Sequence, residues 1–132
     1  MSINPQDAVQ DFHEAFDLTR SEVPGLPSTA IRDLRIKLLR EEWEEYLEGE
    51  ATNDLTEIAD ALADMVYIAY GTAVAYGIPL DKVFAEVHRS NMAKLGPDGK
   101  PIYREDGKVL KPANWTPPDI NTALYGGNNT NK

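Results

Sequence analysis

Ten acidic side chains lie within residues 41–64, a window that contains no Lys or Arg. The whole chain of 132 residues has a formal net charge of −9, so the rest of the chain is nearly neutral. Blocks of like charge are usually solvated faces or disordered tails. The same window also shows the apolar spacing of helices, so the geometry of those helices decides whether its carboxylates all face water.

Cap signals and helical spacing of apolar residues predict an all-α fold. Asn4-Pro5, Ser28 and Asp54 resemble helix starts, and Gly77 resembles a helix end. The predicted helices cover residues 5–20, 29–50, 54–76 and 79–95.

The chain changes character after residue 95. Asp106-Gly107 lies between two short runs and predicts a β-hairpin, and Thr116-Pro-Pro-Asp119 predicts a short final helix. We therefore expect a four-helix bundle unit with a short C-terminal β-hairpin arm, as one domain over residues 1–125, followed by a disordered tail over residues 126–132.

Composition excludes several classes of protein. The chain has no Cys, which removes disulfides and zinc–thiolate sites, and neither of its two His residues follows a Glu by three, as di-iron carboxylate bundles require. The acidic balance argues against binding a nucleic-acid polymer. Asp60 and Asp64 interrupt the most apolar stretch, which argues against a membrane span. Residues 1–20 show no signal-peptide pattern, so we expect a cytoplasmic protein.

Two carboxylates continue the apolar stripe of the second predicted helix. At 100° per residue, Glu42 and Glu45 lie about 40° and about 20° to either side of Leu38. Glu41 flanks the same stripe. Alternatively, the buried face turns toward Leu39, Trp43 and Tyr46, which would leave the acids at a wet edge.

The third predicted helix carries a second acidic face. Glu57, Asp60 and Asp64 share one side of it, and a solvated amphipathic face is the simplest interpretation of this helix alone. Taken together, the two helices could bring several carboxylates side by side, where desolvation and repulsion raise their pKa values unless a cation intervenes. Mg²⁺ takes oxygen ligands of this kind and shares its shell with substrate phosphates.

These residues resemble the MazG-like family of all-α nucleoside triphosphate pyrophosphohydrolases, which includes phosphoribosyl-ATP pyrophosphohydrolases. The family pattern is Glu-Glu-x-x-Glu on one helix and Glu-x-x-Asp on the next. The segment from Leu38 to Glu45 matches the first part, and Leu62-Ala-Asp64-Met-Val-Tyr67 matches the stretch around the second Asp. The segments Val87–Lys94 and Asp98-Gly-Lys100 resemble single-domain bacterial or phage members.

One position departs from the family pattern. If Asp64 is the motif's Asp, the Glu three residues earlier is replaced by Ala61. Either Asp60 takes over that role, or Glu57-x-x-Asp60 is itself the motif pair and Asp64 is an extra ligand.

The resemblance implies that the protein converts (deoxy)nucleoside triphosphates and water to the monophosphate and pyrophosphate. It implies Mg²⁺ as cofactor, with Mn²⁺ as a substitute, held by Glu42, Glu45 and Asp64 together with Asp60 or Glu57. Glu41 is the residue expected to orient or deprotonate the attacking water.

The resemblance also implies that basic and polar side chains surround the triphosphate. Asn91 and Lys94 are the first choice for phosphate or base contacts, and Arg89, Lys108 and Lys111 are weaker candidates. Lys94 could instead complement a helix C-terminus, and a solvated role is the favoured interpretation of Lys108 and Lys111.

Family members are typically dimers or tetramers, so we expect a homo-oligomer in the cytoplasm, that of the host if the protein is phage-encoded. A dUTPase-like or phosphoribosyl-ATP pyrophosphohydrolase activity is an alternative within the enzyme class. A non-catalytic acidic helical module that binds a basic partner is the alternative outside it.

Overall fold

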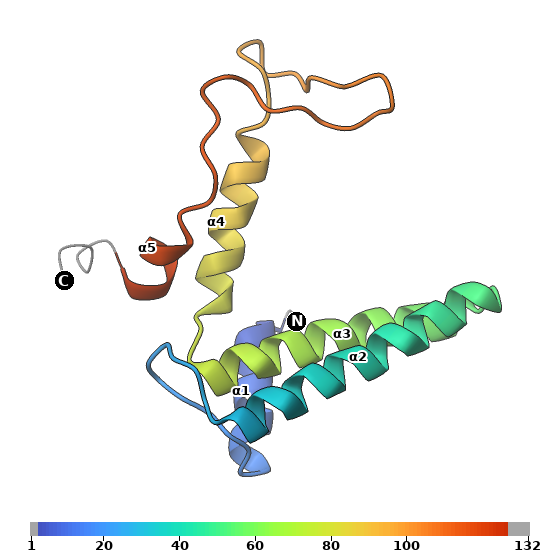
Figure 1. The fold of residues 1–132 in the computed structure, drawn as a ribbon, viewed down its shortest axis with the longest axis vertical. Coiled ribbons are helices and arrows are strands. Elements are labelled where there is room, and N and C mark those ends of the chain that lie inside the picture. The colour runs from blue at the N-terminus through green and yellow to red at the C-terminus, as the bar shows by residue number, and fades with distance from the viewer. Residues whose placement is uncertain (1–2, 127–132) are drawn as a thin grey trace. The chain divides into compact units, whose positions relative to one another are not determined.

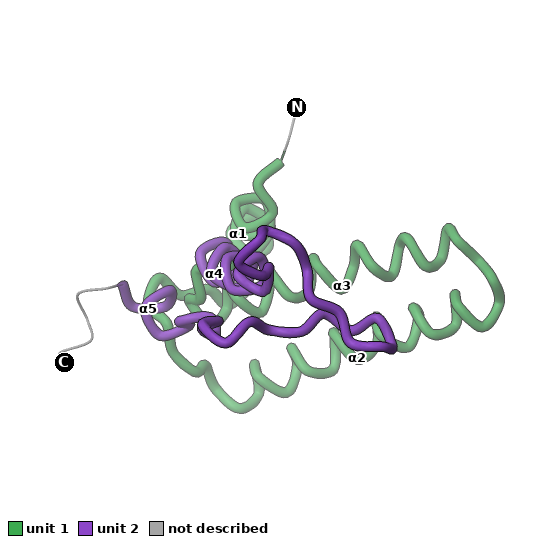
Figure 2. Tube along the Cα trace, turned by 90° about the horizontal axis from the view of Figure 1, so that it is seen from above, with its two compact units in different colours: residues 1–80 green, residues 81–132 purple. Residues whose placement is uncertain are grey.

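The computed structural model describes residues 3–126, and within that range the chain is helical with no strand (Figure 1). The chain divides into two compact units, residues 1–80 and 81–132 (Figure 2). These units subdivide the single domain that the sequence predicts. The tail predicted over residues 126–132 lies, apart from Gly126, outside the described residues. The helices are α1 (Pro5–Ala15), α2 (Thr29–Ala51), α3 (Leu55–Tyr76), α4 (Leu80–Met92) and α5 (Ile120–Tyr125).

Unit 1 is a helical hairpin of α2 and α3, with α1 packed on α3. The predicted caps are confirmed: the side chains of Asn4, Ser28 and Asp54 each accept a hydrogen bond from a backbone N–H in the first turn of α1, α2 and α3. Gly77 ends α3 in the left-handed conformation, with φ of 71°. The helix predicted over residues 5–20 is shorter than expected, because Asp17 has φ of 54° and reverses the chain.

The core of unit 1 is made of small side chains. Val9, Ala61, Ala73, Val74 and Ala75 are buried, and His13 and Arg35 are the buried side chains of unit 1 that carry polar groups. By length and composition alone α3 could cross a membrane, but here it lies against both α1 and α2. The small core lets the helices approach closely. At Gly49, an added Cβ would lie only 3.0 Å from the side chain of Ile58.

Unit 2 is built on α4, which ends at Met92 where the sequence predicts residue 95. The chain beyond it folds back onto α4. Trp115 donates from Nε1 to the Ser90 carbonyl at 2.7 Å, and the Ser90 hydroxyl donates to the Thr116 carbonyl at 2.9 Å. Glu86 accepts from the backbone N–H of Asp119 at 2.7 Å. The predicted short helix after Asp119 is present as α5.

The predicted β-hairpin arm is wrong. The chain does reverse at Gly107, but residues 3–126 show only one isolated antiparallel bridge there, between Tyr103 and Val109. The physical reason is that a two-stranded ribbon is marginal in water without a sheet or helix to cover it. Both bridge residues are exposed, so no apolar face supports longer strands.

Candidate active site

Glu42 projects from α2 toward α3. Its side chain is half-buried, and Oε1 is sealed from solvent without a hydrogen-bond partner among the described residues. Leu39 and Trp43, which the alternative interpretation would bury, are 42% and 49% exposed. The structure therefore turns Glu42 inward and leaves Leu39 and Trp43 exposed, but Tyr46 is half-buried and Glu45 is exposed, as in the alternative interpretation.

The surroundings of Glu42 favour its protonated form. Burial raises the pKa of its carboxyl to about 7, and the negative charges of Asp64, Glu45 and Asp60 add to the effect. The Asp64 carboxyl is also within hydrogen-bonding reach, which stabilises a proton between the two groups. Asp64 and Asp60 come from α3, so the acids of the two helices face one another.

Glu57 extends this arrangement toward the turn between α2 and α3. Burial raises its pKa, and the charges of Glu45, Asp54, Asp60 and Glu48 raise it further. Glu45 thus acts on both Glu42 and Glu57 and joins the two ends of the group. We call the five acids Glu42, Glu45, Glu57, Asp60 and Asp64 the carboxylate cluster.

The carboxylate oxygens of the carboxylate cluster are the type of ligand that a hard divalent cation prefers. Within residues 3–126, no three acidic or histidine side chains converge tightly enough to hold an ion as they stand. Even so, all five donors are carboxylates, and one of them presents a buried oxygen with no partner. A cation between α2 and α3 would satisfy that oxygen and offset the repulsion, after side-chain rotation.

The position of Ala61 bears on the motif alignment. Ala61 is 1% exposed, so its side chain is packed inside the fold. In contrast, the charge of Glu45 on α2 raises the pKa of Glu57, and the charge of Asp60 raises the pKa of Glu42 on α2. This geometry favours Glu57-x-x-Asp60 as the pair, with Asp64 as an additional member.

The remaining predicted residues lie outside this group. Glu41 is exposed on α2. The substrate-binding candidates belong to unit 2, where Asn91 is exposed in the last turn of α4 and Lys94 is half-buried just beyond it. Their contact with substrate stays a prediction.

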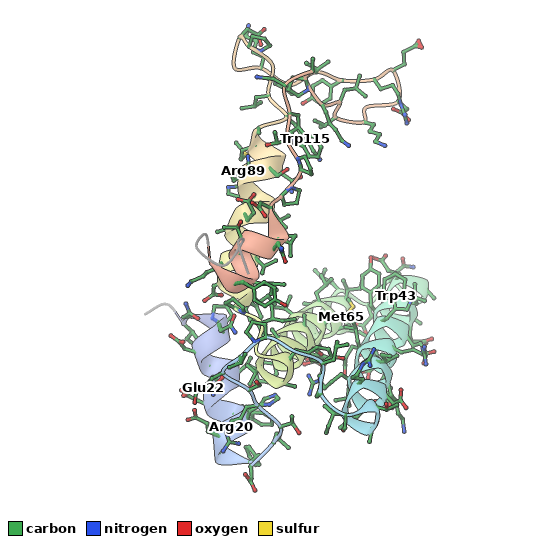
Figure 3. All side chains as sticks on the ribbon, turned by 60° about the vertical axis from the view of Figure 1, so that its left-hand side comes forward. Arg20, Glu22, Trp43, Met65, Arg89 and Trp115 are labelled. Atoms are coloured by element: carbon green, nitrogen blue, oxygen red, sulfur yellow. The ribbon has the colours of Figure 1, made fainter. Side chains whose placement is uncertain are left out.

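The weaker basic candidates already have partners or face water. Arg89, labelled with Trp115 in Figure 3, forms a two-pronged ion pair with Glu86 at 2.9 Å and donates to the Pro117 carbonyl. Lys111 places Nζ 4.4 Å from the ring centre of Trp115, and Lys108 is exposed. Within unit 2, Arg89 and Lys111 thus contribute to the folding of the chain onto α4.

Sequence reasoning missed His13 and Arg35, which are both buried. Arg35 donates from Nε to the Thr72 hydroxyl at 3.1 Å and from Nη2 to the Ile68 carbonyl at 2.9 Å. It passes over Gly71, where a Cβ would lie 2.3 Å from Arg35 Nη2 and 3.1 Å from His13 Nε2. The signal available in the sequence for the burial of Arg35 was its position about 60° from Leu38, at the edge of the apolar stripe.

Comparisons with known proteins identify the family of this chain. The sequence model of the phosphoribosyl-ATP pyrophosphohydrolase family matches residues 9–91, which include all of α2, α3 and the carboxylate cluster. An uncharacterized protein of Acanthamoeba polyphaga mimivirus is 32% identical over 78 residues, or 59% of this chain. The match spans only 29% of that relative's length. The chain belongs to the phosphoribosyl-ATP pyrophosphohydrolase family, within the MazG-like superfamily of all-α pyrophosphohydrolases.

Proposed function

We propose that this protein is a Mg²⁺-dependent nucleotide pyrophosphohydrolase that converts a nucleoside triphosphate and water to the monophosphate and pyrophosphate. Membership of the family implies a hydrolase of pyrophosphate bonds. The observation that carries the finer proposal is the buried, unpartnered oxygen of Glu42, which faces the acids of α3. A helix pair needs no such group for packing, and a surface for a basic partner would not bury it.

The carboxylate cluster would hold the cation. Glu42 and Glu45 from α2 and Asp64 from α3 are the proposed ligands, with Glu57 or Asp60 completing the set. When bound, Mg²⁺ neutralises phosphate charge and lowers the pKa of a bound water. The acids are held on two helices, α2 and α3, and the packing of these helices sets the distance between the acids.

Water attacks the α-phosphorus in the proposed reaction, and the bond to the bridging oxygen of the β-phosphate breaks. Pyrophosphate leaves with that oxygen, and the proton of the water passes to a base. Glu41 is the proposed base, because it lies next to Glu42 in the chain and is exposed to water. Asn91 and Lys94 are the proposed contacts to the outer phosphates.

Two substrate classes compete within this reaction. The resemblance to single-domain members favours deoxynucleoside triphosphates. The description of the matching family favours phosphoribosyl-ATP. Both classes release pyrophosphate when the bond between the α- and β-phosphates breaks. One assay of pyrophosphate release with deoxynucleotides, ribonucleotides and phosphoribosyl-ATP therefore shows which class is the substrate.

The test measures pyrophosphate and phosphate release separately, with and without Mg²⁺. We expect pyrophosphate only with Mg²⁺, and we expect Glu45→Gln to abolish release without changing the helical content. Glu44→Gln is the matched control, since Glu44 is an exposed acid of the same helix outside the carboxylate cluster. Release of phosphate alone, or full activity of Glu45→Gln, would refute the proposed reaction or the proposed ligands.

We also propose that the active form is a homo-oligomer, a dimer or a tetramer. The support is a shallow, mostly apolar groove on unit 1. It is lined by Ile36, Leu39, Trp43 and Met65, together with Arg40, and Figure 3 labels Trp43 and Met65. Ile36, Leu39 and Trp43 are 53%, 42% and 49% exposed. Exposed apolar surface of this kind marks interaction sites. Light scattering coupled to size exclusion tests this, and a monomeric mass for the wild type would exclude it.

A further inference from the structure

Unit 1 contains a cavity of about 420 Å³ between α1, the loop after it and the start of α2. Its walls are mostly apolar, and Leu18, Ile31, Leu34, Leu38 and Ala75 form them. This volume lies within the range of small-molecule pockets, which is roughly 300–1,000 Å³. Its polar lining comes from Thr19 and from the two buried residues, His13 and Arg35. Asp17 also borders the cavity, but its side chain is 97% exposed.

His13, which lines the cavity, carries a hydrogen-bond acceptor. Its Nδ1 lies 2.8 Å from the Thr19 carbonyl oxygen, which can only accept, so Nδ1 carries the hydrogen. Burial lowers the pKa of the imidazole, and the charges of Arg35 and Arg20 oppose protonation as well. The ring is therefore neutral near pH 7, and Nε2 bears a lone pair.

Arg35, which also lines the cavity, carries a hydrogen-bond donor that the fold does not use. Two of its nitrogens are bonded to α3, and Nη1 has no hydrogen bond among the described residues. Glu42 Oε1 is the one described side-chain atom that is both sealed from solvent and unpartnered. His13 and Arg35 both line the cavity, so His13 Nε2 and Arg35 Nη1 are the candidate acceptor and donor for a molecule bound in it.

The α2 residues that line the cavity lie on the same face of the helix as Glu42. Ile31, Leu34 and Leu38 belong to the stripe that Glu42 continues one turn later. Arg35 precedes Glu42 by seven residues, or about 10 Å of helix rise. That separation is comparable with the length of a ribose and two phosphates. A nucleotide with its phosphates at the cluster can therefore reach the cavity with its base.

We propose that this cavity is the base-recognition pocket, and that His13 and Arg35 are its specificity-determining residues. The proposal rests on the proposed function. One acceptor and one donor between apolar walls match the edge of a nucleobase, where a donor and an acceptor stand side by side. Oxo bases and amino bases present that pair in opposite order. The wrong order leaves two buried polar groups unpaired, and such sites discriminate by large factors.

Isosteric variants of His13 separate recognition from folding. In His13→Asn the amide nitrogen can replace Nδ1 and keep the bond to Thr19, but the Nε2 acceptor is lost. In His13→Gln the amide oxygen can replace Nε2. We expect the wild type to prefer oxo or amino bases by at least about tenfold in kcat/KM, which corresponds to about 1.4 kcal/mol. We expect His13→Asn to reduce this preference to within about threefold, mainly through KM, and His13→Gln to retain it.

Binding provides a readout that needs no turnover. The chain has only two histidines, and His88 is exposed, so ¹⁵N spectra of the side chains report on His13 with His88 as internal control. Titration with each deoxynucleoside monophosphate should shift the Nε2 signal of His13 and leave that of His88 unchanged.

The outcomes distinguish the two proposals. Pyrophosphate release with an unshifted His13 signal, or with a base preference that His13→Asn retains, overturns the pocket and leaves the proposed function standing. The pocket is equally overturned if the wild type hydrolyses all bases at rates within about threefold of one another. Absence of both hydrolysis and nucleotide binding overturns the proposed function and the pocket with it.

Discussion

Gly71→Ala tests whether the path of Arg35 across α3 holds unit 1 together. The new methyl group would lie 2.3 Å from Arg35 Nη2, whereas carbon and nitrogen atoms at rest lie about 3.5 Å apart or more. The guanidinium must therefore retreat by about 1 Å, and its 2.9 Å hydrogen bond to the Ile68 carbonyl breaks. Losing a charged hydrogen bond of this kind costs about 1.5–3 kcal/mol.

The substitution also brings a gain, because Ala favours a helix interior over Gly by about 1 kcal/mol. The net expectation is a loss of about 0.5–2 kcal/mol in the free energy of unfolding. For a chain of this length, the midpoint of thermal unfolding should fall by roughly 2–8 °C. Urea unfolding followed by circular dichroism should show a lower midpoint with an unchanged slope.

The Arg35→Met background supplies the control. Met keeps the apolar stem of Arg35 and stops short of Gly71, so the clash disappears and only the gain in helix propensity remains. Gly71→Ala should then stabilise by about 1 kcal/mol, and the double-mutant cycle should report a coupling of about 1.5–3 kcal/mol. Equal effects of Gly71→Ala in both backgrounds would refute the reasoning.

Three further predictions concern other contacts. The pKa of Glu86 is lowered to about 2, chiefly by its bond to Arg89, so this carboxylate holds the Asp119 amide above pH 4.5 and loses it as the pH falls toward 2. The amide signal of Asp119 should follow this transition, and in Glu86→Gln the transition should be absent. Asp54→Ala should cost about 1 kcal/mol in unfolding experiments, because it removes the cap of α3, whereas Asp54→Asn should cost only a few tenths. Ala61→Glu should lower the free energy of unfolding by about 3 kcal/mol or more, because it buries a charge. As a control, a Glu in place of the exposed Ala59 should be tolerated. Tight Mg²⁺ binding by a stable Ala61→Glu protein would instead favour position 61 as the motif position.

The helices could be predicted from the sequence because their signals are local. Asn4, Ser28 and Asp54 cap the first turns with their own side chains, and Gly77 supplies a conformation that other residues avoid. The hairpin arm was predicted from an equally local signal, and it failed. A turn can reverse the chain by itself, but strands need neighbours to pair with and a surface to cover, and nothing near Gly107 in the sequence reports their absence.

For the candidate site, the sequence could predict only which side chains share one face of the same helix. That rotation placed Glu42 on the apolar stripe, and the structure turns it inward. It could not identify Arg35, because the apolar stripe is defined by its hydrophobic residues and an arginine at its edge is read as solvated. The burial of Arg35 depends on Gly71, which lies 36 positions later on another helix. Such a pairing is visible only once α2 and α3 are placed side by side.

The turn between α2 and α3 links the carboxylate cluster to the kinetics of folding. Only Thr52, Asn53 and Asp54 separate the two helices, so all five acids lie within a single helical hairpin. Closing so short a loop costs little chain entropy, and contacts this local form early. We therefore expect the acids to come together in the transition state for folding, before α1 docks on α3. Their repulsion should then slow folding, and a divalent cation that screens it should raise the refolding rate at low denaturant as well as slow unfolding.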